Sequence, residues 1–360
     1  MKIVICGLSI TSSWGNGHAT TYRALLRGLN ARGHEIVFFE RDLEWYASNR
    51  DMPQPAFCQV HIYERWPEVQ PLLRHELIDA DVAIVGSYFP DSAEAIPTVL
   101  SSNVPVKAFY DIDTPITVSK LRAGDAEYLT REQLKGFDIY FSFTGGPMLC
   151  ELQREFGAKR TIPLYCSFDP DRYRLSEPDD QFRCELSYMG TFATDRQRRL
   201  EELLCKPAAK LPGSRFIVAG PQYPSGIFWP KNVKRVIHLE PKFHPPFYCS
   251  SRFTLNLTRK DMIEAGYSPS VRLFEAAGCG AAIISDTWNG IDSFFTPGVE
   301  ILLAESASEV VTFLTELSDA QVDTIGLRAQ ERVLAEHTAE KRALQFEDFV
   351  GAKALARQCA

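Results

Sequence analysis

The sequence has no uninterrupted apolar run of about 18 residues, the length that a transmembrane helix needs. Its first residues, Met1 to Cys6, already have the pattern of a buried strand. They do not form the basic segment followed by a long apolar one that marks a secretory signal. We therefore expect a protein of the cytoplasm with no membrane span.

Paired cysteines are also missing. The nine cysteines include no Cys-x-x-Cys pair, their number is odd, and several, such as Cys6 and Cys166, lie in hydrophobic runs. Zinc sites and disulfide frameworks need cysteines at short, regular spacings. The sequence therefore predicts reduced, mostly buried thiols, and it predicts no metal site.

Positive charge is in deficit, because 39 Lys and Arg residues face 46 Asp and Glu residues, for a net charge of −7. Such an acidic balance is not typical of proteins that bind nucleic acid non-specifically. We expect no nucleic-acid partner. An anionic small ligand would need local arginines or helix N-termini in order to bind.

The chain does have the hydrophobic content, 45%, of an ordinary globular protein, and its 360 residues suffice for two domains. A strand at residues 2–8, a helix at 19–32 and a strand at 35–40 are predicted in succession. This order predicts a parallel strand pair joined by a helix, the unit of a Rossmann-like α/β domain. Further strands are predicted at residues 82–86, 106–110, 139–143 and 161–166.

Residues 167–181, rich in proline and acidic side chains, interrupt this series. A second α/β series follows, with strands at residues 185–189, 215–219, 234–239, 253–257 and 281–285 and helices at 195–204, 269–277, 307–317, 319–336 and 338–350. The predicted domains are residues 1–168 and 184–337. A linker at 169–183 joins them, and a C-terminal segment at 338–360 follows.

A glycine loop follows the first predicted strand. Gly15 and Gly17, with Asn16 between them, permit a tight turn and a close backbone approach to a ligand. The next helix points N–H groups at the same space. His18 stands at the mouth of the turn and can take a proton from an attacking hydroxyl, so it is our candidate base. The alternative is that His18 only caps the helix or bonds a backbone carbonyl.

Two carboxylates, Asp111 and Asp113, follow a later strand of the same domain. One could orient His18, the pair could bind acceptor hydroxyls, or both could form a turn that caps the next helix. A metal held through substrate phosphates is a further interpretation, but no third ligand lies nearby in the sequence. Gly145 and Gly146 follow the next strand and either admit a ligand or simply make the turn.

A helix start with two embedded charges lies in the second half. Ser268 is the predicted N-cap, and Ser270 falls in the first turn. The N–H groups there, together with Arg272, can bind a diphosphate, and Glu275 on the same face can accept hydrogen bonds from a ribose. The alternative is an Arg272–Glu275 pair on a solvated face.

Other polar residues follow strands or begin helices in the second half: Gly190, Thr191, Arg196, Tyr223 and Arg259. An arginine near a helix N-terminus opposes the helix dipole, so a bound anion would explain Arg196. The alternative is ordinary solvated surface. Tyr223 could stack on a base.

A dinucleotide enzyme is a weaker interpretation of the first glycine loop. Gly15 and Gly17 have no third glycine at the expected spacing. Glu40, at the end of the next strand, is nevertheless placed like an acid that binds the ribose of NAD.

Six segments resemble a GT-B glycosyltransferase, specifically the CgeB-like (spore maturation) branch of the group 1 glycosyltransferases. They are residues 13–23, 110–115, 142–147, 188–191, 219–224 and 272–280. The most specific is the last, Arg272-Leu273-Phe274-Glu275-Ala276-Ala277-Gly278-Cys279-Gly280.

This resemblance implies two Rossmann-like domains that face each other across a cleft, with the C-terminal helix crossing back to the first. It implies that the acceptor binds mainly in the first domain and the nucleotide-sugar donor in the second, with Glu275 on the ribose and with Arg272 and the Gly190 loop near the diphosphate. Metal and other cofactors are usually dispensable in this fold. Many retaining members have a glutamate where this chain has Tyr267. Pairing of His18 with Asp111 would be similar to inverting members, which favours inversion.

The leading prediction is therefore a hexosyltransferase-type glycosyltransferase that moves a sugar from a nucleotide-diphosphate sugar to an acceptor hydroxyl. The alternatives are a nucleotide-sugar 2-epimerase and a non-catalytic nucleotide-sugar-binding protein. The sequence identifies neither the donor's base and sugar, nor the acceptor, nor the oligomeric state.

Overall fold

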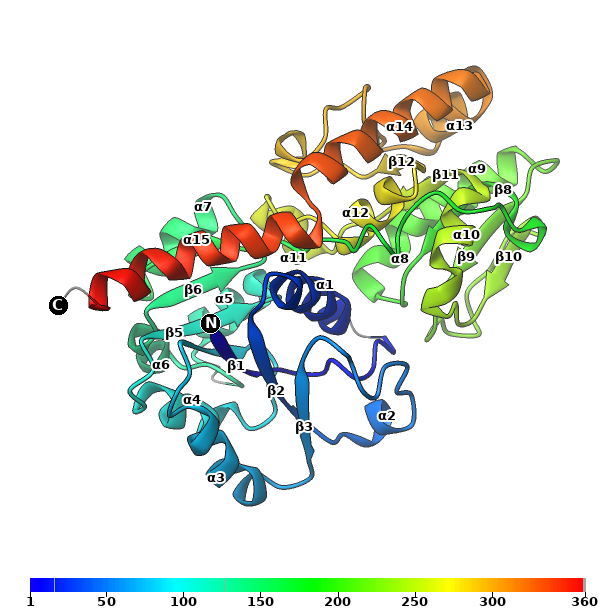
Figure 1. Ribbon diagram of the computed structural model, residues 1–360. Helices are drawn as coiled ribbons and strands as arrows, with labels where there is room; N and C mark the ends of the chain where they lie inside the picture. Colours follow the sequence, from blue (N-terminus) through cyan, green and yellow to red (C-terminus); the bar gives the residue numbers. More distant parts are fainter. Residues whose placement is uncertain (16, 126, 359–360) are drawn as a thin grey trace. The chain divides into compact units, whose positions relative to one another are not determined.

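The computed structural model describes the chain except residues 16, 126, 359 and 360, and beyond residue 351 it describes the backbone alone. The chain forms two compact units (Figure 1). The first unit combines Met1–Ser167 with the C-terminal segment from Ala339, and the second is Phe168–Thr338. Residues 169–183, expected as a linker, lie within the second unit. In the part of the chain that the structure describes, no helix is both long and apolar enough to cross a membrane.

The first unit has a seven-stranded parallel sheet in the order β3-β2-β1-β4-β5-β6-β7. Its strands are β1 (Lys2–Cys6), β2 (Glu35–Arg41), β3 (Gln59–Tyr63), β4 (Val82–Gly86), β5 (Val106–Asp111), β6 (Ile139–Ser142) and β7 (Thr161–Pro163). Its helices are α1 (Gly17–Ala31), α2 (Glu44–Ala47), α3 (Trp66–Glu76), α4 (Ser92–Leu100), α5 (Thr114–Ala123), α6 (Arg131–Gly136), α7 (Pro147–Arg154) and α15 (Ala339–Gln358). The strand order reverses between β1 and β4. Ligands of open α/β sheets bind beside such a reversal, at the carboxyl ends of the strands.

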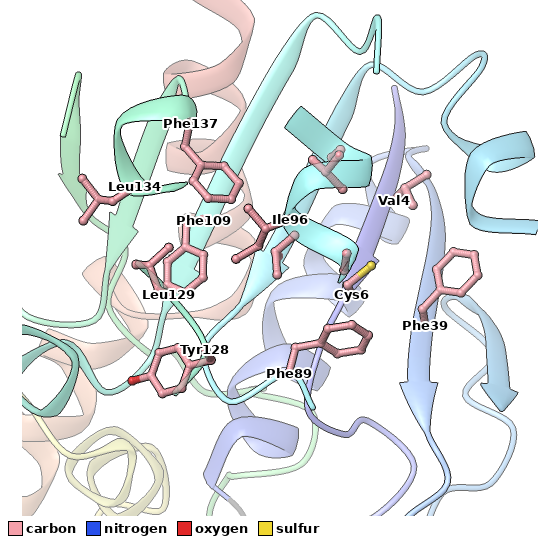
Figure 2. Close-up of a cluster of buried hydrophobic side chains, with 14 of the residues drawn as sticks. Val4, Cys6, Phe39, Phe89, Ile96, Phe109, Tyr128, Leu129, Leu134 and Phe137 are labelled. Carbon is pink, nitrogen blue, oxygen red and sulfur yellow. The ribbon is translucent and has the colours of Figure 1, made fainter. Parts of the chain in front are cut away.

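Apolar side chains hold this sheet from both faces. One cluster, shown in Figure 2, includes Val4, Cys6, Phe39, Phe89, Ile96, Phe109, Tyr128, Leu129, Leu134 and Phe137. The predicted face of α1, formed by Tyr22, Leu25, Leu26 and Leu29, is also buried. Strand β1, buried from Ile3 to Cys6 and paired with β2 and β4, thus fixes where the loop after it begins.

Helix α15 packs against α1 within the first unit. Gly28 permits the contact, because a Cβ at this position would lie 2.5 Å from the Ala339 carbonyl oxygen. Glu347 accepts hydrogen bonds from Arg32 (2.7 Å) and from His34 (2.6 Å). The C-terminal helix is therefore part of the first unit's fold.

The second unit repeats the same plan with six parallel strands in the order β10-β9-β8-β11-β12-β13. The strands are β8 (Cys184–Met189), β9 (Phe216–Ala219), β10 (Val233–Val236), β11 (Ser251–Asn256), β12 (Ala282–Ser285) and β13 (Leu302–Leu303). The helices are α8 (Thr194–Leu200), α9 (Lys206–Lys210), α10 (His244–Cys249), α11 (Lys260–Ala265), α12 (Val271–Gly278), α13 (Ala307–Glu316) and α14 (Asp319–Glu336), with a π-helical turn, Glu201–Cys205, between α8 and α9. The order reverses between β8 and β11. Two parallel Rossmann-like sheets confirm the predicted α/β class.

Candidate functional site

At the carboxyl edge of the first sheet, the loops after β1 and β5 bring His18 and Asp113 together. Nε2 of His18 lies 2.6 Å from Oδ2 of Asp113, and both side chains are largely buried. The His18 ring also meets Tyr88 edge-on, with ring centroids 6.0 Å apart. A carboxylate on one imidazole nitrogen fixes the tautomer and supports a positive charge on the ring. The pair therefore has the contact that a histidine base and its orienting acid would need.

The expected pairing of His18 with Asp111 is wrong, since Asp113 is the partner. Asp111 is fully buried and accepts hydrogen bonds from the Tyr140 hydroxyl and from the Asp113 backbone N–H, the latter at 3.0 Å. Burial, with a smaller contribution from the Asp113 charge, raises the pKa of Asp111 to about 6. Asp111 thus shapes the turn that aims Asp113 at the histidine.

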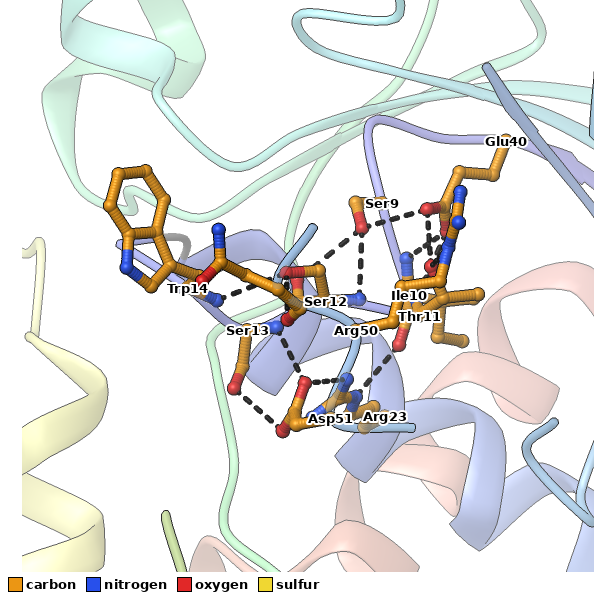
Figure 3. A network of polar contacts seen from close by, with 11 residues as sticks. Ser9, Ile10, Thr11, Ser12, Ser13, Trp14, Arg23, Glu40, Arg50 and Asp51 are labelled. Carbon is orange, nitrogen blue, oxygen red and sulfur yellow. Dashed lines mark hydrogen bonds and ion pairs between the residues drawn. The ribbon is translucent and has the colours of Figure 1, made fainter. Parts of the chain in front are cut away.

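The loop between β1 and α1 is fixed by a second carboxylate, Glu40, at the end of β2 (Figure 3). Glu40 is fully buried and accepts four hydrogen bonds, from Ser9 Oγ (3.0 Å), Ile10 N (2.6 Å), Thr11 N (3.0 Å) and Thr11 Oγ1 (2.6 Å). Its oxygens are committed to the protein. The interpretation of Glu40 as a ribose-binding acid of a dinucleotide enzyme therefore finds no support here.

Asp51 holds the same loop from the other side. It accepts hydrogen bonds from Ser13 N (2.9 Å) and Ser13 Oγ (2.8 Å), and it forms a two-bond ion pair with Arg23 of α1 (2.8 Å each). The Arg23 Nε also donates to the Ile10 carbonyl at 2.8 Å. The loop that leads to His18 is thereby built before any ligand arrives.

The glycines expected at this edge have different surroundings. Gly15, with φ of +59°, and Gly17 are exposed, with nothing near the position of a Cβ, whereas Asn16 lies outside the described residues. Gly145 is buried, and a Cβ there would lie 2.0 Å from the Tyr165 hydroxyl oxygen. Gly145 therefore makes room for a side chain of the protein. Gly146, with φ of +63°, turns the chain into α7.

In the second unit, Arg272 of α12 lies at the point where the strand order reverses. Its Nη1 donates to the carbonyl of Met189 (2.7 Å), and its Nη2 donates to that of Leu257 (2.9 Å). Met189 ends β8, and Leu257 directly follows β11. One guanidinium thus spans the two strands beside which an α/β sheet binds its ligand.

Arg196 and Arg259 add positive charge around Arg272. The Arg196 Nη2 donates to the Thr191 carbonyl at 2.8 Å, and its buried Nε has no hydrogen-bond partner among the described residues. Burial, together with the charges of Arg272 and Arg259, lowers the pKa of Arg196. Arg259 has one carboxylate contact, to Asp195, at 3.5 Å. Guanidinium groups that bond carbonyls keep their full charge, so this edge favours an anion.

Gly190 lies close to Arg272, which forms an arginine cluster with Arg196 and Arg259. A Cβ here would lie 2.9 Å from Arg272 Nη1 and 2.6 Å from the Tyr188 hydroxyl, so this close approach needs glycine. The Tyr223 hydroxyl donates to the Gly190 carbonyl at 3.1 Å. Arg235 covers the Tyr223 ring at 4.0 Å from its centroid. That face is occupied, so Tyr223 supports the loop in this structure, which differs from the base-stacking role that we expected.

Ser270, and not Ser268, caps the helix that carries Arg272. The Ser270 Oγ accepts hydrogen bonds from the backbone N (3.3 Å) and from Nε (3.1 Å) of Arg272. Ser268 is buried, and its hydroxyl donates to the Met262 sulfur at 3.1 Å. The helix starts later than expected, because Ser270 keeps an extended backbone and Val271 is its first residue.

Glu275 is 3% exposed on the same helix. It bonds the Tyr173 hydroxyl, and burial raises its pKa. Arg272 bonds two carbonyls, so the alternative of an Arg272–Glu275 pair on a solvated face is wrong. Glu275 is a buried acceptor close to the arginine cluster.

Three residues of this edge escaped the sequence analysis: Tyr173, Arg235 and Asp286. Asp286 is buried and accepts hydrogen bonds from Thr258 N (2.9 Å) and Thr258 Oγ1 (2.8 Å). The sequence could have indicated Asp286, because this residue directly follows the strand β12. The described residues hold no group of three His, Cys, Asp or Glu side chains placed to bind a metal.

Residues 196–348 match a family model described as "Glycosyl transferase-like". A comparison with curated proteins gave no match. Several solved structures share the fold over nearly the whole chain. Sucrose-phosphate synthase from Thermosynechococcus elongatus is 14% identical, with a TM-score of 0.68 over 100% of this chain and 99% of that one.

Two further structures carry nucleotide ligands. Anabaena HepE in complex with UDP and glucose is 13% identical, with a TM-score of 0.70 over 98% of this chain and 100% of that one. An alpha-glucosyltransferase in complex with UDP-glucose and DNA is 12% identical, with a TM-score of 0.71 over 98% of this chain and 99% of that one. The chain has the GT-B fold of these glycosyltransferases. Together with the family-model match, this confirms the predicted enzyme class, a glycosyltransferase.

Proposed function

We propose that the protein transfers a sugar from a nucleotide-diphosphate sugar to an acceptor hydroxyl, with His18 as the base and without a required metal ion. The observation that carries this proposal is Arg272, which spans the strand reversal of the second sheet beside Arg196 and Arg259. The match to the glycosyltransferase model covers the same residues. The resemblance to the CgeB-like branch and a cytoplasmic location stay predictions.

The donor is assigned to the second unit. A diphosphate beside Arg196, Arg259 and Arg272 would gain charge-assisted hydrogen bonds, and Glu275 would accept from the ribose in place of Tyr173. UDP-glucose is the first donor to test, because HepE and the alpha-glucosyltransferase were both solved with UDP or UDP-glucose. The arginines also stabilise the charge that grows on the leaving diphosphate.

The acceptor is assigned to His18. The acceptor's proton would pass to the imidazole of His18, whose Nε2 lies 2.6 Å from Asp113, as the acceptor oxygen attacks the anomeric carbon. The C–O bond to the diphosphate breaks in the same reaction, and the imidazolium is stabilised by Asp113. This chemistry inverts the anomeric carbon. Tyr267 stands where many retaining members of the resembled family have a glutamate, which agrees with inversion.

A binding experiment tests the donor site. Thermal shifts with UDP-, GDP- and dTDP-sugars should single out one nucleotide, since at equal concentration the ligand that binds more tightly stabilises the folded protein more. Arg272→Ala should reduce the affinity for that ligand at least tenfold. Arg198→Ala, a change at an exposed arginine of α8, is the matched control and should leave affinity unchanged.

A turnover experiment tests the base. Removal of a general base typically costs 10²–10⁴-fold in rate, so His18→Ala should reduce transfer at least 100-fold and leave donor affinity intact. His238→Ala, at an exposed histidine, is the control. Epimer formed from donor alone would instead indicate an isomerase, and donor binding without any turnover would indicate a binding protein.

A further inference from the structure

Arginines at the carboxyl edge of the first sheet bond carboxylates. Arg23 forms two bonds of 2.8 Å with Asp51, Arg41 lies 2.9 Å from Asp91, and Arg50 lies 2.7 Å from Asp42. Lys120, whose ammonium lies 5.5 Å from the centroid of the Tyr88 ring, pairs with Glu127. Each of these positive charges is matched by a negative one.

In the second unit, Arg252, Arg259 and Arg332 also pair with carboxylates, but three arginines at the carboxyl edge of its sheet bond carbonyls instead. Arg196, Arg235 and Arg272 donate to backbone carbonyls at 2.7–3.0 Å. A carbonyl is a dipole and cancels no net charge, whereas a carboxylate cancels one unit. The two sheets therefore present different potentials at their carboxyl edges.

The surroundings of His18 strengthen the contrast. Asp113 touches the imidazole and Asp111 accepts a hydrogen bond from the Asp113 backbone N–H, so a further anion would meet like charge. Arg342 does donate to the Cys166 carbonyl near β7, but it is 2% exposed and out of reach of a ligand. Trp14 instead gives a half-exposed apolar surface, and its ring extends from the fixed loop on the side away from Glu40 (Figure 3).

We infer that the acceptor is an uncharged hydroxyl compound, and that the first unit discriminates against phosphorylated or carboxylated acceptors. The inference rests on the proposed function, which places the acceptor hydroxyl at His18. The reason is charge pairing. In the second unit, the donor's diphosphate would meet arginines that bond carbonyls and stay charged. In the first unit, an anionic acceptor would meet arginines whose charge a carboxylate already neutralises.

Matched acceptor pairs test this inference. With UDP-glucose as donor, glucose is compared with glucose 6-phosphate, and fructose with fructose 6-phosphate. The neutral member of a pair should have at least tenfold higher kcat/KM. A phosphorylated member that equals or exceeds its neutral partner overturns the inference.

A structural measurement decides the case in which no acceptor of the panel reacts. Crystals soaked with sodium selenate, a tetrahedral dianion with anomalous signal, should show it beside Arg196 or Arg272 and not within hydrogen-bond distance of Arg23, Arg41 or Arg50. Selenate on any of the latter overturns the inference. Selenate missing from Arg196 and Arg272 as well removes the proposed donor site, and the inference with it.

A variant with an unpaired arginine tests whether charge pairing causes the expected preference for neutral acceptors. Asp42→Asn releases Arg50, whose side chain is 19% exposed, and should shift the acceptor preference, or selenate binding, towards the anion at least threefold. Asp79→Asn removes one of the two carboxylates that pair with Lys2 at the amino end of β1 and is the matched control, with no shift expected. If Asp42→Asn leaves the acceptor preference unchanged, the charge-pairing account is refuted. Sugar transfer by the wild-type protein would in that case still support the proposed function.

Discussion

The two carboxylates of one turn, Asp111 and Asp113, have different surroundings. Asp113 contacts the imidazole of His18, and Asp111, two residues earlier, is fully buried and bonded to Tyr140. Because a buried carboxylate loses its hydration, the burial that fixes Asp111 also disfavours its charged form. The geometry of the base is therefore obtained at some expense in stability.

A pH-dependent stability effect follows for Asp111. Its folded pKa of about 6 lies above the ordinary value of 3.8, so its stabilising contribution is complete below pH 3.8 and is lost as the pH rises through 6. Asp111→Asn keeps the uncharged form at every pH. Its free energy of unfolding, relative to wild type, should rise by roughly 2.4 kcal/mol between pH 4 and pH 7, because at 1.36 kcal/mol per pKa unit about four-fifths of the full effect falls within this range.

Urea unfolding at pH 4, 5, 6 and 7 measures this difference. Asp79→Asn is the control of opposite sign, because the hydrogen bond from Lys2 lowers the pKa of Asp79 and the stabilisation is lost as the pH falls. A difference between Asp111→Asn and wild type that stays constant over this range would contradict the assignment of Asp111.

Single residues also show what the sequence can and cannot predict. Arg272 and Glu275 were identifiable because two charges interrupt an otherwise apolar helix start. The choice between Asp111 and Asp113 was not, since it depends on which carboxylate the turn buries against Tyr140 from β6. The helix cap was misplaced for a similar reason: two serines flank Pro269, and backbone geometry selects Ser270.

Among the elements, the buried strands were predictable and the exposed edge strand was not. Strand β4 is a continuous apolar run, β1 is apolar after Lys2, and β5 is apolar apart from Lys107 and its last residue, Asp111. Strand β3 pairs only with β2 in the sheet order, and it is mostly exposed or half-buried, so its sequence carries little apolar signal. The loop after β1 was recognised by its glycines, whereas its attachment to Glu40 depends on the pairing of β1 with β2.

The loop that carries Trp14 and His18 should depend on Glu40. Glu40→Gln replaces one acceptor oxygen by an NH₂ group facing the N–H and O–H donors of Ile10 and Thr11, which removes bonds and adds a repulsion. We expect kcat with acceptor to fall at least tenfold, while donor affinity stays unchanged because the donor residues belong to the second unit.

Thr11 supplies the matched pair for this prediction. Thr11→Val removes the hydroxyl that bonds Glu40 and keeps the side-chain shape, whereas Thr11→Ser keeps the hydroxyl. The valine variant should lower kcat and the serine variant should retain it, both measured beside the melting temperature and the donor Kd. Equal activity of the two variants would show that the loop needs no such bond.

In the molecule as a whole, one strand plan appears twice. Each unit has a parallel sheet whose order reverses after its first strand, and each places its candidate residues at that reversal. The difference between the units lies in side chains: a histidine–aspartate pair in the first, and arginines on carbonyls in the second. Under the proposed function, the same architecture would support proton transfer in one unit and anion binding in the other.

The units should also differ in their ability to fold alone. The second unit, Phe168–Thr338, contains its whole sheet and the arginine cluster, so this fragment should fold and bind UDP. A fragment of Met1–Ser167 lacks α15 and would expose the surface that covers Phe346 and Val350, both fully buried in the whole chain. It would also lose the ion pairs of Glu347 with Arg32 and His34.

Calorimetry and circular dichroism of the two fragments measure this asymmetry. Phe168–Thr338 should unfold cooperatively and be stabilised by UDP, with Arg272→Ala as the control that removes the ligand effect. Met1–Ser167 should unfold without a sharp transition, and a fusion that joins residues 339–358 to it should restore one. A cooperative Met1–Ser167 fragment with an undiminished melting temperature would show instead that the C-terminal helix adds nothing to the fold of the unit that holds His18.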